Sequence, residues 1–121
     1  MKLHGIELFS NDVERTKDFY SSVIGLRTKL DEDGLKVFDP GIEGVDLNIS
    51  GHYPANKISL SFLVKDLDAF VEIMMEQKLN LEPPYNSHLG LRAVTVVDND
   101  GCRVVVHSPT NLSPQWLKDK V

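Results

Sequence analysis

The chain repeats one pattern at a distance of 54 residues, and this repeat constrains the fold more than any other feature. When Asp66 is aligned with Asp12, the segment LSFLVKDLDAFVEIMMEQKLN falls on IELFSNDVERTKDFYSSVIGL. In each copy a strand with alternating apolar residues runs into the aspartate, and the apolar spacing then predicts a helix of about three turns. The sequence therefore predicts one supersecondary module written twice.

Each predicted helix has a start signal and an apolar face. In the first copy, Asn11 and Glu14 are spaced as a capping box, and Gly25 can end the helix in a left-handed conformation. In the second copy, Asp66 is the expected cap. The residues expected to face the core are Val13, Thr16, Phe19, Tyr20 and Val23 in the first helix, and Leu67, Phe70, Val71 and Met74 in the second.

Three short strands are expected after each helix. They are residues 26–31, 35–39 and 44–50 in the first copy, and about 79–82, 90–98 and 101–107 in the second. The sequences DEDG and DNDG are hairpin turn signals. Each copy is therefore a βαβββ module, and the predicted fold class is α+β.

The length of 121 residues suits one domain. We expect a single domain over residues 1–121, with module one at 3–51, module two at 57–108 and a C-terminal tail at 109–121. Within the tail, Ser113 is the expected cap of a short helix with Pro114 at its first position. Trp116 would cover an apolar edge of the domain or of a partner chain.

Charge and composition narrow the expected partners. The formal net charge of -5 disfavours a nucleic-acid or anionic-membrane surface, because such binding needs clustered Lys and Arg. The sequence shows neither an apolar run long enough to span a bilayer nor a signal-peptide core, so we expect a cytoplasmic protein. The single Cys102 excludes an internal disulfide and a Cys-rich zinc site.

Two segments in order, NDVERTKDFYSSVIGL and GLRAVTVVDNDGCRVVV, resemble the glyoxalase / bleomycin-resistance / extradiol dioxygenase group, the vicinal oxygen chelate superfamily. The resemblance covers residues 3 to about 109. It implies that the two βαβββ modules form a curled mixed sheet around a concave cavity, and that the protein is a homodimer. It also implies that catalytic members hold a divalent metal on the sheet, with ligands from the first and fourth strands of each module.

The resemblance places the four metal-ligand positions at Gly5, Asn48, Ser59 and Val105. These residues bind a divalent cation weakly or not at all. His4 lies one residue from the first position, so strand alternation points it to the other face. We therefore predict no metal and no other cofactor.

The same alternation and the resemblance together define the candidate ligand-binding residues; the catalytic residues, if any, stay unknown. Three of them would supply apolar contact and the others would orient polar groups, with Arg92 suited to a carboxylate or phosphate or, alternatively, to an ion pair with a nearby acid. His107 is either a general base or an exposed strand-end residue. The candidates are Glu7, Phe9, Asn48, Ser59, Ser61, Leu63, Arg92, Arg103, Val105 and His107.

Three functions remain open at this point. The first is metal-independent binding of a small organic molecule in the cavity, as bleomycin-resistance proteins sequester their ligand. The second is a glyoxalase- or dioxygenase-like enzyme with a rearranged metal site, in which Glu7, Asp46 and His107, or a His4 turned inward by a bulge, would hold Zn, Ni, Mn or Fe. The third is a dimer with a vestigial cavity that binds another macromolecule.

Overall fold

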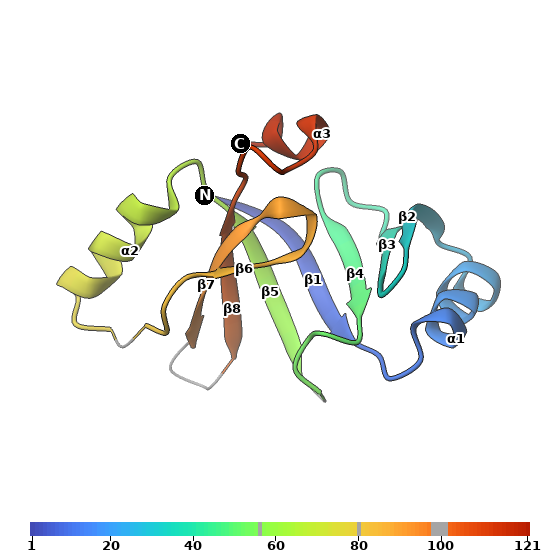
Figure 1. Ribbon diagram of the computed structural model, residues 1–121. Helices are drawn as coiled ribbons and strands as arrows, with labels where there is room; N and C mark the ends of the chain where they lie inside the picture. Colours follow the sequence, from blue (N-terminus) through green and yellow to red (C-terminus); the bar gives the residue numbers. More distant parts are fainter. Residues whose placement is uncertain (56, 80, 98–101) are drawn as a thin grey trace. The chain divides into compact units, whose positions relative to one another are not determined.

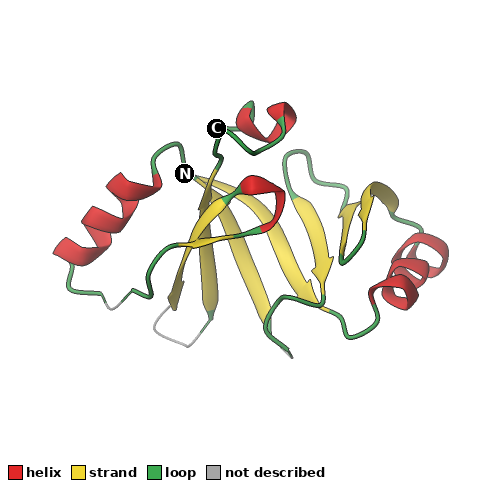
Figure 2. Ribbon diagram, viewed as in Figure 1, coloured by secondary structure: helices red, strands yellow, loops and turns green. Residues whose placement is uncertain are grey.

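The computed structural model describes residues 1–55, 57–79, 81–97 and 102–121, and divides them into two compact units (Figure 1). The first unit is His4–Leu60, and the second combines Met1–Leu3 with Ser61–Val121. Strands and helices follow one another within each unit (Figure 2), so the predicted α+β class is confirmed.

The first unit has the predicted βαβββ order. Its strands hydrogen-bond in the order β2-β3-β4-β1, with β1 parallel to β4 and the other pairs antiparallel. The elements are β1 (Lys2–Phe9), α1 (Val13–Asp18), the π-helical turn η1 (Phe19–Ile24), β2 (Arg27–Glu32), β3 (Leu35–Asp39) and β4 (Asp46–Ser50).

The second unit repeats the order, and its strands follow as β5-β8-β7-β6. The β7–β8 pair is antiparallel, with Val94 opposite Val106 and Ala93 opposite His107. The elements are β5 (Ile58–Leu63, which enters this unit at Ser61), α2 (Leu67–Glu76), β6 (Tyr85–Asn86), the 3-10 turn η2 (His88–Gly90), β7 (Arg92–Val97), β8 (Arg103–Ser108) and α3 (Gln115–Lys118).

Each helix packs on one face of its own sheet. In the first unit Figure 1 shows α1 beside β2 and β3, and the Tyr20 and Phe38 rings lie 5.8 Å apart between their centroids. In the second unit Leu67 of α2 is buried with Val94 and Val106. Burial of such side chains is the main favourable term in folding, so these contacts fix which face of each sheet is covered by its helix.

A second cluster holds the C-terminal tail on its unit. Leu63, Leu91 and Leu117 are buried together, with Leu89 and Val121 packed against them. The tail residue that covers the apolar surface most completely is Leu117, whereas Trp116 is 45% exposed and lies under the Lys120 ammonium.

Several local signals predicted from sequence are confirmed. Asp66 caps α2 by accepting a hydrogen bond from the Ala69 amide at 3.1 Å. Gly25 ends η1 with φ of 87°, and Gly34 sits in the turn between β2 and β3 with φ of 76°. In both positions φ is positive, which glycine adopts without steric penalty.

Two helix caps were predicted one residue too early. Asp12, not Asn11, caps α1 by accepting from the Arg15 amide at 3.2 Å. The predicted capping box is wrong because the Glu14 carboxylate pairs with Lys36 instead of reaching back. Similarly Pro114 rather than Ser113 is the cap of α3, because the Ser113 hydroxyl accepts from the Thr110 amide.

The predicted inward face of the first helix is wrong at two positions. Phe19 is 47% exposed and Val23 is 70% exposed. Both belong to the π-helical turn, whose hydrogen bonds span five residues rather than four. This wider turn takes the side chains off the 3.6-residue face on which the prediction relied.

The strand predicted at 79–82 is also wrong, since the described residues 79, 81 and 82 form no strand. Pro83 and Pro84 have no amide hydrogen for a sheet ladder, and pairing starts only at Tyr85, opposite Ala93. The predicted DNDG turn lies outside the described residues. No helix in the described ranges is both long and apolar enough to cross a membrane.

We predict that Leu117→Ala lowers the free energy of unfolding by about 2–5 kcal/mol, because it leaves a cavity at a fully buried position. Urea denaturation followed by circular dichroism measures the change. Leu112→Ala in the same tail is the matched control, since Leu112 is 86% exposed and its truncation should change stability by less than about 0.5 kcal/mol. Equal effects of the two substitutions would contradict the packing of the tail described above.

Candidate functional site

In each unit, the sheet face turned away from the helix carries polar side chains. We call the first of these the first helix-distal face, which comprises Gly5, Glu7, Val37, Asp46 and Asn48. Val37 and Glu7 both pair in register with Asn48, and Gly5 pairs with Asp46, so all five lie on one side. Lys36 and Phe38 alternate with Val37 and lie on the other side, where Lys36 contacts Glu14 of α1 and Phe38 contacts Tyr20 of η1.

The first helix-distal face combines burial with charge. Glu7 is 4% exposed, and Asp46 and Asn48 are buried as well. The Lys29 ammonium forms an ion pair with the Asp46 carboxylate. A buried carboxylate is stable only when it is paired or hydrogen-bonded, so the Lys29 ammonium compensates the buried charge of Asp46.

Gly5 lies against the Asn48 side chain. A Cβ atom added to Gly5 would be 2.6 Å from the Asn48 amide nitrogen and 3.0 Å from the Asp46 carbonyl oxygen. Both distances are shorter than carbon contacts normally allow. The space of a side chain at position 5 is therefore already taken, and Asn48 must move before any other residue can enter.

The second helix-distal face comprises Ser61, Thr95, Arg103, Val105 and His107. Strand alternation places Arg103, Val105 and His107 on one side of β8, and Thr95 pairs with Val105. The Ser61 hydroxyl and His107 Nδ1 are hydrogen-bonded at 2.9 Å, and both residues are almost fully buried. The structure thus brings four of the predicted ligand-binding residues together in this unit.

A hydrogen-bond chain extends this face toward β6. The Arg103 guanidinium donates to the Tyr85 hydroxyl at 3.2 Å, and the Tyr85 and Thr95 hydroxyls are 3.0 Å apart. Arg103, Tyr85 and Thr95 are all half-buried rather than enclosed. A guanidinium fork beside a phenol hydroxyl presents several donors to one ligand group.

Leu63 alternates to the same side of β5 as Ser61, but there it is buried against Leu91 and the tail residue Leu117. Other predicted residues lie elsewhere. Arg92 is exposed, donates to the Asn86 side chain at 3.1 Å, and alternates to the face of β7 opposite that of Thr95. Ser59 is buried in the first unit, and His4 is buried on the side of β1 opposite Gly5.

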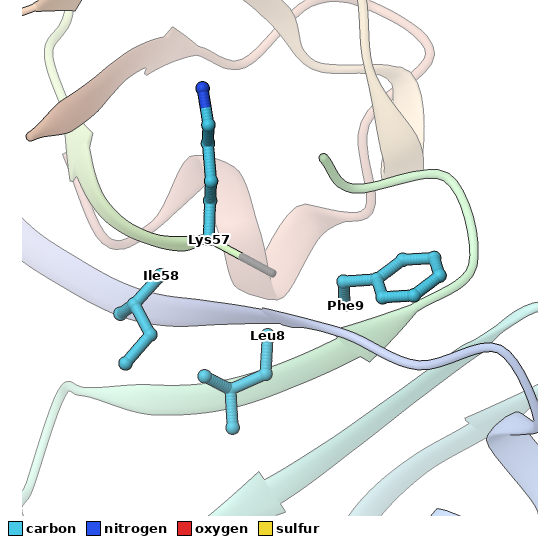
Figure 3. Close-up of a pocket in the computed structure, with 4 residues that line it drawn as sticks. All are labelled: Leu8, Phe9, Lys57 and Ile58. Carbon is cyan, nitrogen blue, oxygen red and sulfur yellow. The ribbon is translucent and has the colours of Figure 1, made fainter. Parts of the chain in front are cut away.

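Phe9 lines a small pocket in the first unit. The pocket has a volume of about 230 Å³, and the residues around it are Leu8, Phe9, Lys57 and Ile58. Figure 3 shows Leu8 and Ile58 pointing to one side of the chain, whereas the Lys57 side chain extends to the other. Of the residues that line the pocket, only Phe9 was predicted to bind a ligand. The volume of the pocket is below the range usual for drug-sized ligands.

Sequence reasoning missed Tyr85, Thr95 and Lys29. Thr95 was detectable, because the alternation of the predicted strand at 90–98 places it opposite Val105 once the hairpin register is known. Tyr85 was missed because the strand was placed at 79–82 rather than after the two prolines. Lys29 occupies a register shift in β2 between Thr28 and Leu30, and no pattern in the sequence marks this irregularity.

The donors at the four positions implied by the resemblance do not fit a divalent metal. The side chains at Gly5 and Val105 have no ligating atom, and the remaining two offer only the Asn48 amide and the Ser59 hydroxyl. Val105 is also 1% exposed, in a packed strand. Across residues 1–55, 57–79, 81–97 and 102–121, no three His, Cys, Asp or Glu side chains are grouped so that they could hold a metal ion.

The fold and the two helix-distal faces define a protein of two βαβββ units. A family model for the Glyoxalase/Bleomycin resistance protein/Dioxygenase superfamily matches residues 2–106. The chain therefore belongs to this superfamily, as its sequence pattern predicted. No curated protein matches the chain in sequence.

Solved structures share the fold at low sequence identity. A Legionella pneumophila protein named as NAD-dependent benzaldehyde dehydrogenase superposes with a TM-score of 0.74 at 15% identity, over 88% of this chain and 98% of that one. A superfamily member from Vibrio splendidus 12B01 gives 0.62 at 19% identity, over 87% and 96%. Methylmalonyl-CoA epimerase from Mycobacterium tuberculosis gives 0.62 at 16% identity, over 95% and 90%. At these identities the likeness concerns the fold alone.

We predict that Gly5→Ala lowers the free energy of unfolding by about 1–3 kcal/mol, because the new methyl group overlaps the Asn48 amide. Adding Asn48→Ala should recover part of this loss, so a double-mutant cycle should give a coupling of at least about 0.5 kcal/mol. Chemical denaturation of the four proteins measures it. Strict additivity of the two changes would contradict the close approach of these residues.

Proposed function

We propose that this protein binds a small organic molecule without a resident metal ion, through the helix-distal faces of its sheets. The observation that carries the proposal is a contrast between the metal-ligand positions and other positions on the same strands. The side chains of Gly5 and Val105, at two of the metal-ligand positions, have no donor atom, whereas neighbouring positions hold polar side chains such as His107. The faces thus keep polar groups but lack a metal-ligand set.

The buried Ser61–His107 pair supports a binding role. Burying a hydroxyl and an imidazole costs free energy even when they hydrogen-bond to one another, whereas apolar side chains of similar size would pack there at less cost. Because both side chains are almost fully buried, we place them in the wall of the proposed site, on the same side of β8 as the half-buried Arg103.

Arg103 is the residue that we propose anchors the ligand. Its guanidinium is half-buried on the same face as His107 and donates to Tyr85, which holds the fork in one orientation. Such a fork matches a carboxylate or phosphate group better than a lysine does. We therefore expect the ligand to carry an anionic group.

The superfamily does not supply the ligand's identity, because one scaffold hosts unrelated activities. The relation to methylmalonyl-CoA epimerase is a relation of fold. A rearranged metal site of the glyoxalase or dioxygenase kind would require Asp46, which already pairs with Lys29. The proposal of metal-independent binding is therefore tested directly, with a chelator present.

The test is a thermal-shift screen of a metabolite and antibiotic library against the full chain in the presence of EDTA. A ligand that prefers the native state raises the melting temperature by mass action, so a ligand present at 100 times its Kd should add about 2.7 kcal/mol to the free energy of unfolding. The same screen without EDTA is the control: if shifts occur only there, and return when zinc, nickel, manganese or iron is added to EDTA-treated protein, the proposal is contradicted.

We predict that Arg103→Ala weakens binding of an anionic hit from this screen by about tenfold or more, because the ligand loses a charge-assisted hydrogen bond. The matched control is Arg92→Ala, which removes an arginine from the opposite face of the same sheet. Isothermal titration calorimetry measures both affinities, and circular dichroism checks that each variant is folded. An equal loss in the two variants would remove Arg103 from the site.

A further inference from the structure

Helix α1 and the turn η1 are attached to the first unit with little apolar burial. None of the residues of these two elements, all of which the structure describes, is fully buried. The ring contact between Tyr20 and Phe38 and a hydrogen bond between the Ser10 and Thr16 hydroxyls are among the contacts that hold them. Charged side chains add further contacts between this segment and the sheet.

We call these charged residues the clamp: Glu14 and Lys17 of α1, Asp31 of β2 and Lys36 of β3. Lys36 is 2% exposed, and its ammonium lies 2.6 Å from the Glu14 carboxylate and 2.6 Å from the Asp31 carboxylate. It also donates to the Glu32 carbonyl at 2.9 Å. Lys17 pairs with the other oxygen of Asp31.

The clamp is balanced, with two carboxylates and two ammonium groups. A buried ammonium such as that of Lys36 is tolerated only while carboxylates compensate it. When Asp31 is protonated, Lys36 loses one of its two carboxylate partners and Lys17 loses its partner, so both ammonium groups are less well compensated. The Lys17–Asp31 pair joins α1 to β2, whereas Asp31 and Lys36 face each other across β2 and β3. The energetic penalty therefore falls on the attachment of α1 and on one side-chain pair of the hairpin, not on the sheet's backbone ladder.

The pKa directions agree with this geometry. Hydrogen bonds from Lys17 and Lys36 lower the pKa of Asp31, and the hydrogen bond to Asp31 raises the pKa of Lys36. A carboxylate with a lowered pKa stabilises the folded state above its unfolded pKa of about 3.9 and loses this contribution as the pH falls further. The clamp should therefore weaken below about pH 4.

We propose that the clamp is an acid-sensitive latch, which releases α1 and η1 as one segment while the strands of the chain stay folded. The segment that would come free is Val13–Ile24, and its release would uncover Phe38 on β3. Segments with little apolar burial are the ones that open locally below the global unfolding free energy.

Hydrogen exchange measured by mass spectrometry on the full chain, at pH 7 and pH 3 with correction for intrinsic exchange rates, tests the latch. We expect the amides of residues 13–24 to lose protection about tenfold or more at pH 3, while those of β7 keep theirs. Equal loss in both segments, or no loss in residues 13–24, would overturn the proposal.

Variants separate the latch from a general acid effect. Asp31→Asn should lower the protection of residues 13–24 already at pH 7 and shrink the further loss at pH 3. Asp39→Asn is the matched control, because the pKa of Asp39 is also lowered, by the Gly41 amide and Arg27, yet Asp39 lies outside the clamp. Equal behaviour of the two variants would overturn the proposal, and Glu14→Gln replaces Asp31→Asn if that variant does not fold.

Discussion

The two-residue alternation of side chains along the strands is the constraint on which the account of this protein depends. It separates Gly5 and Glu7 from His4 on β1, and Arg103 and His107 from Val104 and Val106 on β8. A shift of one residue would bring His4 to the helix-distal face and would change the chemistry of that face entirely. The strand registers exclude this shift within each unit, because Glu7 pairs with Asn48 and Ala93 pairs with His107.

Because of this alternation, the two faces of the sheet in each unit differ in polarity. The helix side of the second unit is apolar, with Leu67, Val94 and Val106 in one cluster. The helix side of the first unit instead contains the buried Lys36 and its acidic partners. Ion pairs therefore help to attach the helix to the sheet in this unit, whereas apolar burial attaches it in the other. The opposite sides contain buried polar groups, and the proposed binding role rests on this polarity.

The sequence predicted the module order, the Asp66 cap, the Gly25 terminus and the hairpin at Gly34, because each depends on local propensity or on a repeated pattern. It failed where a nonlocal interaction decided the outcome. Glu14 is spaced as a capping residue, but a tertiary ion pair with Lys36 takes its carboxylate. The Asp31–Lys36 pair was partly readable, since the hairpin turn fixes Asp31 opposite Lys36, but no local pattern brings Glu14 to Lys36. The π-helical turn at Phe19–Ile24 was not readable, because 3.6-residue periodicity assumes a regular helix.

The proposal that this chain binds its ligand without a resident metal ion is the one most open to direct contradiction. Elemental analysis of the full chain, purified without chelator and then dialysed against zinc, nickel, manganese or iron, tests it. The replacement of the ligand positions by Gly5, Asn48, Ser59 and Val105 predicts well below 0.1 equivalents of any bound metal. A stoichiometric metal that stays bound through gel filtration would contradict the account.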